Sequence, residues 1–157
     1  GLEETAALFG LSEKDLQAAI AASQAQDHVL KEIIYEYRSD SNLSFSYDRD
    51  SLFEIQISRG IDKTNFRGNY FFNTNPRTFL TALQEKNGEP PLVQGLDCVF
   101  KNVNVYVWAA FEIMDTGVVR FFREDEELAQ DKSIMLTSQP RNPDENFSDY
   151  IPISFIR

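Results

Sequence analysis

The sequence predicts an α+β fold, in which an N-terminal helix or helical pair and a central helix pack on a twisted, mainly antiparallel sheet. Two observations lead to this prediction. Apolar residues recur at three- and four-residue spacing in the first forty residues and again in residues 76–87, whereas they alternate with polar residues in most other segments. Short turn-forming links join several of the alternating segments, which is typical of antiparallel hairpins.

The N-terminal segment is expected to be helical. A short helix over residues 3–9 should end at Gly10, and Ser12 begins a capping-box pattern for a second helix. An alanine-rich stretch and a further apolar face at helical spacing follow. We favour one long, bent helix over residues 12–38, and a new cap at Asp27 that divides it is the alternative.

The next part of the chain predicts strands. Apolar and polar side chains alternate in residues 43–47 and 53–57, which is the pattern of two half-buried strands, and turn-forming residues 48–51 lie between them. We therefore expect a hairpin here. A third strand is expected over residues 66–73.

The central helix has clear signals at both ends. Asn75 is a good N-cap, Pro76 suits the first helical position, and Gly88 follows a basic last turn as a C′ glycine. These signals predict a helix over residues 76–87. Its inner face consists of Phe79, Leu80 and Leu83.

The following segments alternate again. Residues 96–100 predict a strand that turns at 101–102, and residues 103–114 are apolar on both faces, which indicates a central strand covered on both sides. Residues 115–117, Asp-Thr-Gly, are expected to form a hairpin turn into a strand over residues 118–123.

The C-terminal part begins with four consecutive acidic residues, 124–127, which could open a short helix. A late strand is expected around Ile134 and Leu136, then a polar loop over residues 140–149. Residues 151–155 predict a last strand, which Pro152 places at an edge of the sheet.

The chain is predicted to be a single α+β domain over residues 1–157, because it shows no repeat, low-complexity tract or linker. Its charge is uneven. The helical segment 1–42 holds eight acidic and three basic residues, a net charge of −5. Residues 43–123, which contain the sheet and the helix 76–87, hold nine of each and are neutral. The acidic tail with the final strands, 124–157, again holds eight acidic and three basic residues, a net charge of −5.

Composition argues against several classes of protein. A net charge of −10 and a pI near 4.5 argue against nucleic-acid binding through contacts with the phosphate backbone. One Cys and one His provide neither an internal disulfide nor a Cys/His zinc cluster, and the glycine patterns of nucleotide-binding loops are missing from the sequence. No apolar run approaches the roughly 20 residues of a membrane span. We therefore predict no cofactor, no metal and no membrane partner.

The ends and the compartment are left open. The chain begins with Gly1 rather than Met, which is compatible with a removed tag or with processing of a longer chain. The lone Cys slightly favours the cytoplasm, although a secreted protein without disulfides also fits.

Few residues suggest catalysis. The Asp-Thr-Gly segment resembles the signature of aspartic proteases, in which two such Asp share a proton, so a single copy would require a homodimer. A turn between strands is the favoured interpretation. Cys98 and His28 are the candidates for a thiol nucleophile and its base, but alternation places Cys98 on an inner strand face, and His28 lies in a polar stretch of helix. No catalytic residue is assigned.

We expect a non-enzymatic protein-binding module, such as an adaptor, chaperone, inhibitor or assembly domain, and a homodimer is one assembly to consider. Trp108, Tyr106 and Phe111 are the expected partner anchors. The order helix, three strands, helix and further strands, with the small size and low pI, is similar to the dimeric class of type III secretion chaperones, which is consistent with protein binding. The strand pair around Ile134 and Ile153 departs from that class.

Two other functions remain open. A hydrolase or nuclease could use carboxylates alone, with Asp48, Asp50 and the acidic residues 124–127 around a divalent ion. Alternatively, the segment 59–72 interleaves basic and aromatic residues, which could stack on single-stranded nucleic acid. Core packing is the favoured interpretation of that segment.

Overall fold

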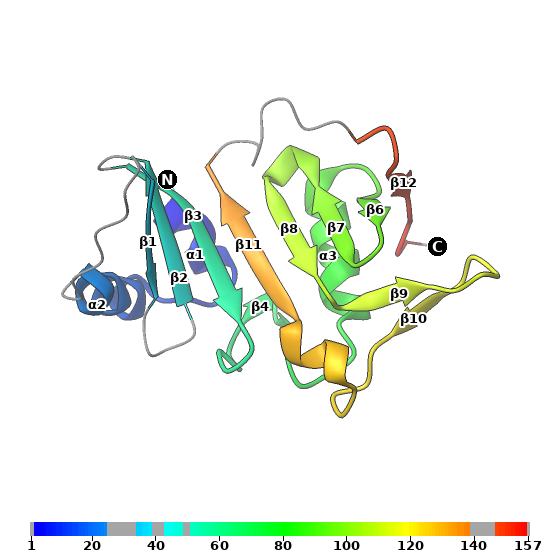
Figure 1. Ribbon diagram of the computed structural model, residues 1–157, viewed down its shortest axis with the longest axis horizontal. Coiled ribbons are helices and arrows are strands. Elements are labelled where there is room, and N and C mark those ends of the chain that lie inside the picture. Colours follow the sequence, from blue (N-terminus) through cyan, green and yellow to red (C-terminus); the bar gives the residue numbers. More distant parts are fainter. Residues whose placement is uncertain (1, 25–33, 39–42, 49–50, 139–146, 157) are drawn as a thin grey trace.

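An antiparallel sheet forms the centre of the computed structural model, which describes residues 2–24, 34–38, 43–48, 51–138 and 147–156. Within these residues the sheet has eight strands in the order β1-β2-β3-β11-β8-β7-β6-β12 (Figure 1). All neighbouring strands are antiparallel. In sheet order, the strands are β1 Ile34–Arg38, β2 Leu43–Asp48, β3 Ser51–Ser58, β11 Ser133–Thr137, β8 Val105–Trp108, β7 Asp97–Phe100, β6 Leu92–Gln94 and β12 Ile151–Pro152.

Helices cover one face of this sheet, which confirms the predicted α+β class. Helix α1 (Leu2–Leu8) packs against β3 and β11, and α3 (Arg77–Asn87) packs against β7, both behind the sheet in Figure 1. Helix α2 (Glu13–Gln24) contacts α1 and the edge strand β1. The core between the helices and the sheet receives the inward side chains of five strands: Phe45, Ile55, Ile57, Ile134, Leu136, Val105, Val107, Cys98 and Phe100.

Helix α3 has the C-terminal cap that the sequence predicts, whereas its N-cap is Pro76, one residue after the predicted Asn75, with no side-chain cap bond of its own. The Asn75 side-chain Oδ1 accepts the Arg77 N–H at 2.9 Å, which satisfies one of the free donors of the first turn. Gly88 ends the helix in the left-handed conformation, with φ of 82° and an N–H bond to the Gln84 carbonyl at 2.9 Å. The expected inner face is confirmed, since Phe79, Leu80 and Leu83 are buried.

Helix α3 also holds the C-terminal segment. Gln84, which is buried, accepts the Phe155 N–H on Oε1 at 2.7 Å and donates from Nε2 to the Ser154 Oγ at 3.0 Å. Thr81 donates to the Phe155 carbonyl at 3.3 Å. The buried Phe155 ring then packs on Phe111 with its centroid 5.4 Å away. Side-chain hydrogen bonds from α3 therefore hold residues 154–155, which are not paired in a strand, against the helix.

The prediction of one long N-terminal helix is wrong. Helix α1 and its stop at Gly10 are confirmed, but α2 ends at Gln24, and Ile34–Arg38 is the strand β1, paired with β2 through Tyr35 opposite Tyr47. Ile and Tyr favour strands, and a short apolar run at helical spacing is ambiguous until a partner strand is available. The proposed cap at Asp27 lies outside the described residues. The observed order starts with two helices and five strands, so it is not the order on which the resemblance to secretion chaperones was based.

The expected third strand over residues 66–73 is also wrong. Two-residue strands, β4 (Asn65–Phe66) and β5 (Asn69–Tyr70), pair with each other as a small hairpin. Arg67 and Gly68 form its turn with φ of 53° and 82°, a combination that two-residue hairpin turns require and that glycine makes easier. The chain after the hairpin is irregular up to α3.

The two-faced strand over residues 103–114 is divided in two. Strand β8 ends at Trp108, and β9 (Phe111–Ile113) belongs to a separate two-stranded sheet with β10 (Val119–Phe121). Between them, Ala109 has a φ of 58° and its N–H donates to the Leu96 carbonyl at 3.1 Å. This bend in the backbone sends the β9–β10 hairpin away from the main sheet (Figure 1).

The remaining predictions concern the hairpin and the C-terminal part. The turn at Asp115–Gly117 is confirmed, with the Gly117 N–H bonded to the Met114 carbonyl at 2.8 Å. The acidic run leads into a 3₁₀ helix, η2 (Glu127–Asp131), and residues 101–103 form a second one, η1 (Lys101–Val103). Strand β12 is an edge strand as predicted, whereas β11 lies in the middle of the sheet between β3 and β8 rather than in a peripheral tail. Most of the polar loop 140–149 lies outside the described residues.

None of the helices within the described ranges combines the length and the apolar character that crossing a bilayer requires.

Candidate functional site

The strands carry a second set of side chains on the face opposite α1 and α3. Because side chains alternate along a strand, residues directly opposite each other on neighbouring strands share a face. One row runs across β3, β11, β8 and β7 as Gln56, Met135, Tyr106 and Val99. The next row contains Ser58, Ser133, Trp108 and Asp97. The two rows bring together side chains from distant parts of the chain.

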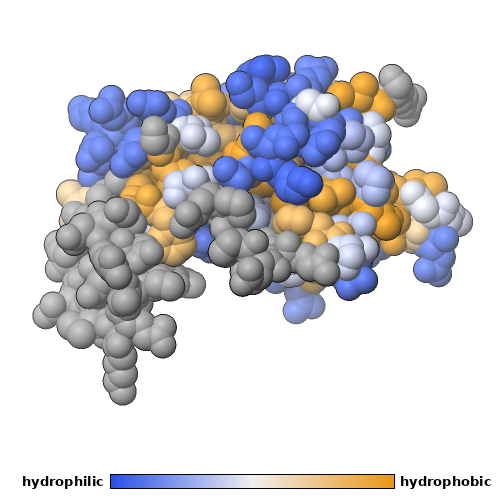
Figure 2. All heavy atoms as spheres, turned by 90° about the horizontal axis from the view of Figure 1, so that it is seen from above, coloured by the Kyte–Doolittle hydropathy of each residue, from blue (hydrophilic) through white to orange (hydrophobic). Residues whose placement is uncertain are grey.

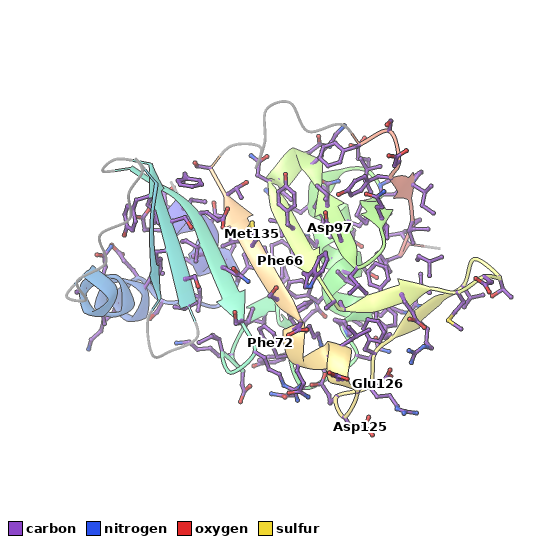
Figure 3. The ribbon with its side chains drawn as sticks, in the orientation of Figure 1. Phe66, Phe72, Asp97, Asp125, Glu126 and Met135 are labelled. Atoms are coloured by element: carbon purple, nitrogen blue, oxygen red, sulfur yellow. The ribbon has the colours of Figure 1, made fainter. Side chains whose placement is uncertain are left out.

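A cavity of about 280 Å³ lies over these two rows. Figure 3 shows Met135 and Asp97 on the strands that flank β8. Six residues line the cavity and are called the outer-face site from here on: Gln56, Asp97, Tyr106, Trp108, Ser133 and Met135.

The two aromatic residues of the outer-face site differ in accessibility. Trp108 is 44% exposed, whereas Tyr106 is only 5% exposed. Trp108 is therefore the ring that a ligand can reach, and Tyr106 is part of the wall that supports it. Large aromatic rings at a partly desolvated site are the side chains that contribute most to protein interfaces.

Asp97 provides the charge of the site. Its Oδ2 accepts the Tyr150 hydroxyl at 2.7 Å, and the Tyr150 ring packs edge-on against Phe147 with centroids 5.1 Å apart. No Lys or Arg in the described ranges forms an ion pair with Asp97. The carboxylate is thus fixed in direction by Tyr150 and still has acceptor capacity.

Two of the three expected anchors meet at the outer-face site, and the third does not. Phe111 is 3% exposed and packs edge-on against Phe121 and Phe155, so it is a core residue. The sequence also gave no reason to select Asp97 or Met135. Alternation placed Asp97 on the outer face of its strand, but no local signal indicates that it lies opposite Trp108.

The acidic run offers little to a metal ion. Glu124 pairs with Arg59 at 3.2 Å and with the buried Lys132 at 3.4 Å. Glu126 receives a bidentate pair of hydrogen bonds from Arg120, at 2.8 and 3.1 Å. In the ranges that the structure describes, no three His, Cys, Asp or Glu side chains group as metal ligands would. Asp50 and the side chain of Asp48 lie outside the described residues.

The aromatic residues of segment 59–72 are mostly core residues. Phe66, Phe71 and Phe72 are buried, and the Lys132 ammonium lies 4.8 Å from the centroid of Phe71. Tyr70 is half exposed. Rings that are buried and capped in this way are not accessible for stacking on nucleic-acid bases.

Cys98 is fully buried on the core face of β7, as predicted. Burial, with a smaller effect from the charge of Asp97, raises the pKa of its thiol well above the usual value. A buried neutral thiol is a poor nucleophile. The other candidate, His28, lies outside the described residues.

Other hollows exist on the surface. One of about 520 Å³ lies beside β5 and the start of α3, where Asp62 already accepts a hydrogen bond from Asn73 at 2.6 Å. From above, Figure 2 shows hydrophobic and hydrophilic side chains intermixed over the described part of the surface. The outer-face site is distinguished from these regions by an exposed Trp beside a carboxylate.

Comparisons with known proteins complete the description of the site. No protein-family model matches the chain, and no match was found among curated proteins or solved structures.

Proposed function

We propose that this protein is a non-enzymatic protein-binding module and that it contacts its partner through the outer-face site. The observation that carries the proposal is the exposed Trp108 on a rigid central strand, beside a cavity. A Trp that is held by strand pairing on both sides loses little conformational freedom on binding. This is the usual setting of an interface anchor.

The size and lining of the cavity support a side chain as the occupant. Its volume of about 280 Å³ lies just below the range of small-molecule pockets, roughly 300–1,000 Å³. Tyr106, Trp108 and Met135 supply apolar contact on β8 and β11, while Gln56 on β3 and Asp97 on β7 supply polar groups on the two flanking strands. An apolar centre with a polar rim is the composition of protein interfaces.

A peptide library displayed on phage tests the proposal. Peptides selected on the wild-type protein should bind Trp108→Ala at least about fivefold more weakly, because truncation of an interface anchor costs more than 1 kcal/mol. Leu8→Ala is the matched control, since Leu8 is 55% exposed but lies on α1, which packs against the opposite face of the sheet. Selected peptides that bind Trp108→Ala as well as the wild type would overturn the proposal.

A homodimer would be one form of the same function. Sedimentation equilibrium of the wild type and of Trp108→Ala tests it, because a dimer that uses the outer-face site should dissociate at higher concentration in the variant. A dimer with unchanged affinity would show that the chains associate through another surface.

A further inference from the structure

We infer that the outer-face site binds the guanidinium group of an arginine side chain on the partner protein, with the guanidinium stacked on Trp108 and hydrogen-bonded to Asp97. This inference rests on the proposed function, because it names the chemistry of the partner at that same site. The inference depends on the relative placement of Trp108 and Asp97.

Asp97 and Trp108 are direct partners in the β7–β8 ladder. Residues paired in this way have their Cβ atoms roughly 4.5–5.5 Å apart and their side chains on the same face. One ligand group can therefore contact both. A guanidinium is planar, so its edge can donate to a carboxylate while its face lies on an aromatic ring.

The carboxylate has capacity for this contact. Tyr150 donates one hydrogen bond, to Oδ2, and an ionised carboxylate offers about four acceptor positions. Because Tyr150 fixes the orientation of Asp97, the remaining acceptor positions are preorganised. Within the described residues no cation of the chain itself neutralises this carboxylate.

The rest of the lining suits an arginine better than a lysine. Met135 offers an apolar wall for the methylene stem, and Gln56 and Ser133 offer acceptor oxygens for the remaining N–H groups of a five-donor guanidinium. An ammonium group is more strongly hydrated and forms no planar stack. The net charge of −10 also attracts a basic partner over longer distances.

The experiment uses Trp108 as its own reporter, because it is the single Trp of the chain. Its fluorescence is followed while the full chain is titrated with nona-arginine and, separately, with nona-lysine, two peptides of equal charge. Nona-arginine should bind about threefold or more tightly than nona-lysine, since stacking and bidentate bonding are available to guanidinium only. Equal dissociation constants for the two peptides on the wild-type protein would overturn the inference without any variant.

Asp97→Asn tests the role of the carboxylate, with Asp115→Asn as its matched control. Both variants remove one negative charge, but Asp115 is exposed in the β9–β10 turn, away from the site. We expect Asp97→Asn to weaken nona-arginine binding about two- to fivefold and Asp115→Asn to have a smaller effect. Equal effects of the two variants would show that only general charge attraction is at work.

The phage selection separates this inference from the proposed function. Peptides that need Trp108 but show no enrichment in arginine would leave the protein-binding function intact and contradict the guanidinium site. Peptides that bind Trp108→Ala normally would contradict the function itself. Arginine-rich peptides that lose affinity for both Trp108→Ala and Asp97→Asn support both.

Discussion

Replacing Gln84 with methionine tests whether one buried side chain holds the C-terminal segment in place. Gln84 is 5% exposed, accepts the Phe155 N–H at 2.7 Å and donates to the Ser154 Oγ at 3.0 Å. Methionine has a similar length and can keep the packing of the side chain, but it cannot provide either hydrogen bond. The variant therefore isolates the polar contribution.

The magnitude follows from what each partner loses. The Phe155 N–H is buried and would be left without its acceptor, which costs about 1–3 kcal/mol. The Ser154 hydroxyl keeps its bonds with the Ile156 carbonyl at 2.9 Å and N–H at 3.2 Å, so its loss adds little. For a chain of this size, about 1–3 kcal/mol corresponds to a lower melting temperature by roughly 2–12 °C.

Urea unfolding and calorimetry measure this loss, and hydrogen exchange at the Phe155 amide shows where it occurs. Gln17→Met is the control, because Gln17 is exposed on α2 and the substitution is the same. We expect the free energy of unfolding to fall in Gln84→Met only, with faster exchange at Phe155. If both variants are equally stable and the Phe155 amide stays protected, the proposed role of Gln84 is wrong.

Three further predictions concern backbone strain, ionisation and reactivity. In urea unfolding, Gly10→Ala should lower the free energy of unfolding more than Gly88→Ala does. Both glycines have a positive φ, but of the two only Gly10 would bring an added Cβ within 2.8 Å of a backbone oxygen. Equal losses of stability in the two variants would contradict this. Two hydrogen bonds from Arg120 lower the pKa of Glu126 to about 2, so the stability that this ion pair contributes is present above pH 4.5 and is lost as the pH falls towards 2. A carboxyl NMR titration should show that Arg120→Gln returns the pKa of Glu126 towards 4.5. An unchanged pKa in the variant would refute the pairing. Burial, with a smaller effect from the charge of Asp97, raises the pKa of the Cys98 thiol. A thiol reagent at pH 8 should therefore label Cys98 only after urea unfolding. Rapid labelling of the native protein would disprove the burial of Cys98.

Elements whose signals are local in sequence were predicted well. Helix α3 is specified by Asn75 before it and Gly88 after it, and the β2–β3 hairpin by strict alternation on both sides of a short link. The turn at Asp115–Gly117 and the burial of Cys98 follow in the same way. For the helix ends, the hairpin and the turn, residues within a few positions of one another make the stabilising contacts, whereas the burial of Cys98 also needs the neighbouring strand β8.

Elements whose state depends on a distant partner were predicted poorly. Residues 34–38 have an apolar spacing that a helix or a strand can accommodate, and pairing with β2 decided in favour of the strand. The segment around Ala109 reads as one strand, yet its bond to Leu96 bends the chain and sends Phe111 into the core while Trp108 stays exposed. Trp108 and Phe111, both aromatic and three positions apart, thus become an exposed residue and a core residue respectively.

The sequence by itself determined the α+β class, the central helix and the β2–β3 and β9–β10 hairpins, and it singled out Trp108 and Tyr106. Only the tertiary structure decided that β11 lies between β3 and β8, and therefore that Met135 and Asp97 flank those aromatic rings. The physical reason is that strand pairing depends on backbone hydrogen bonds between segments far apart in the chain, which all residues can make and which leave no mark in the local pattern of side chains.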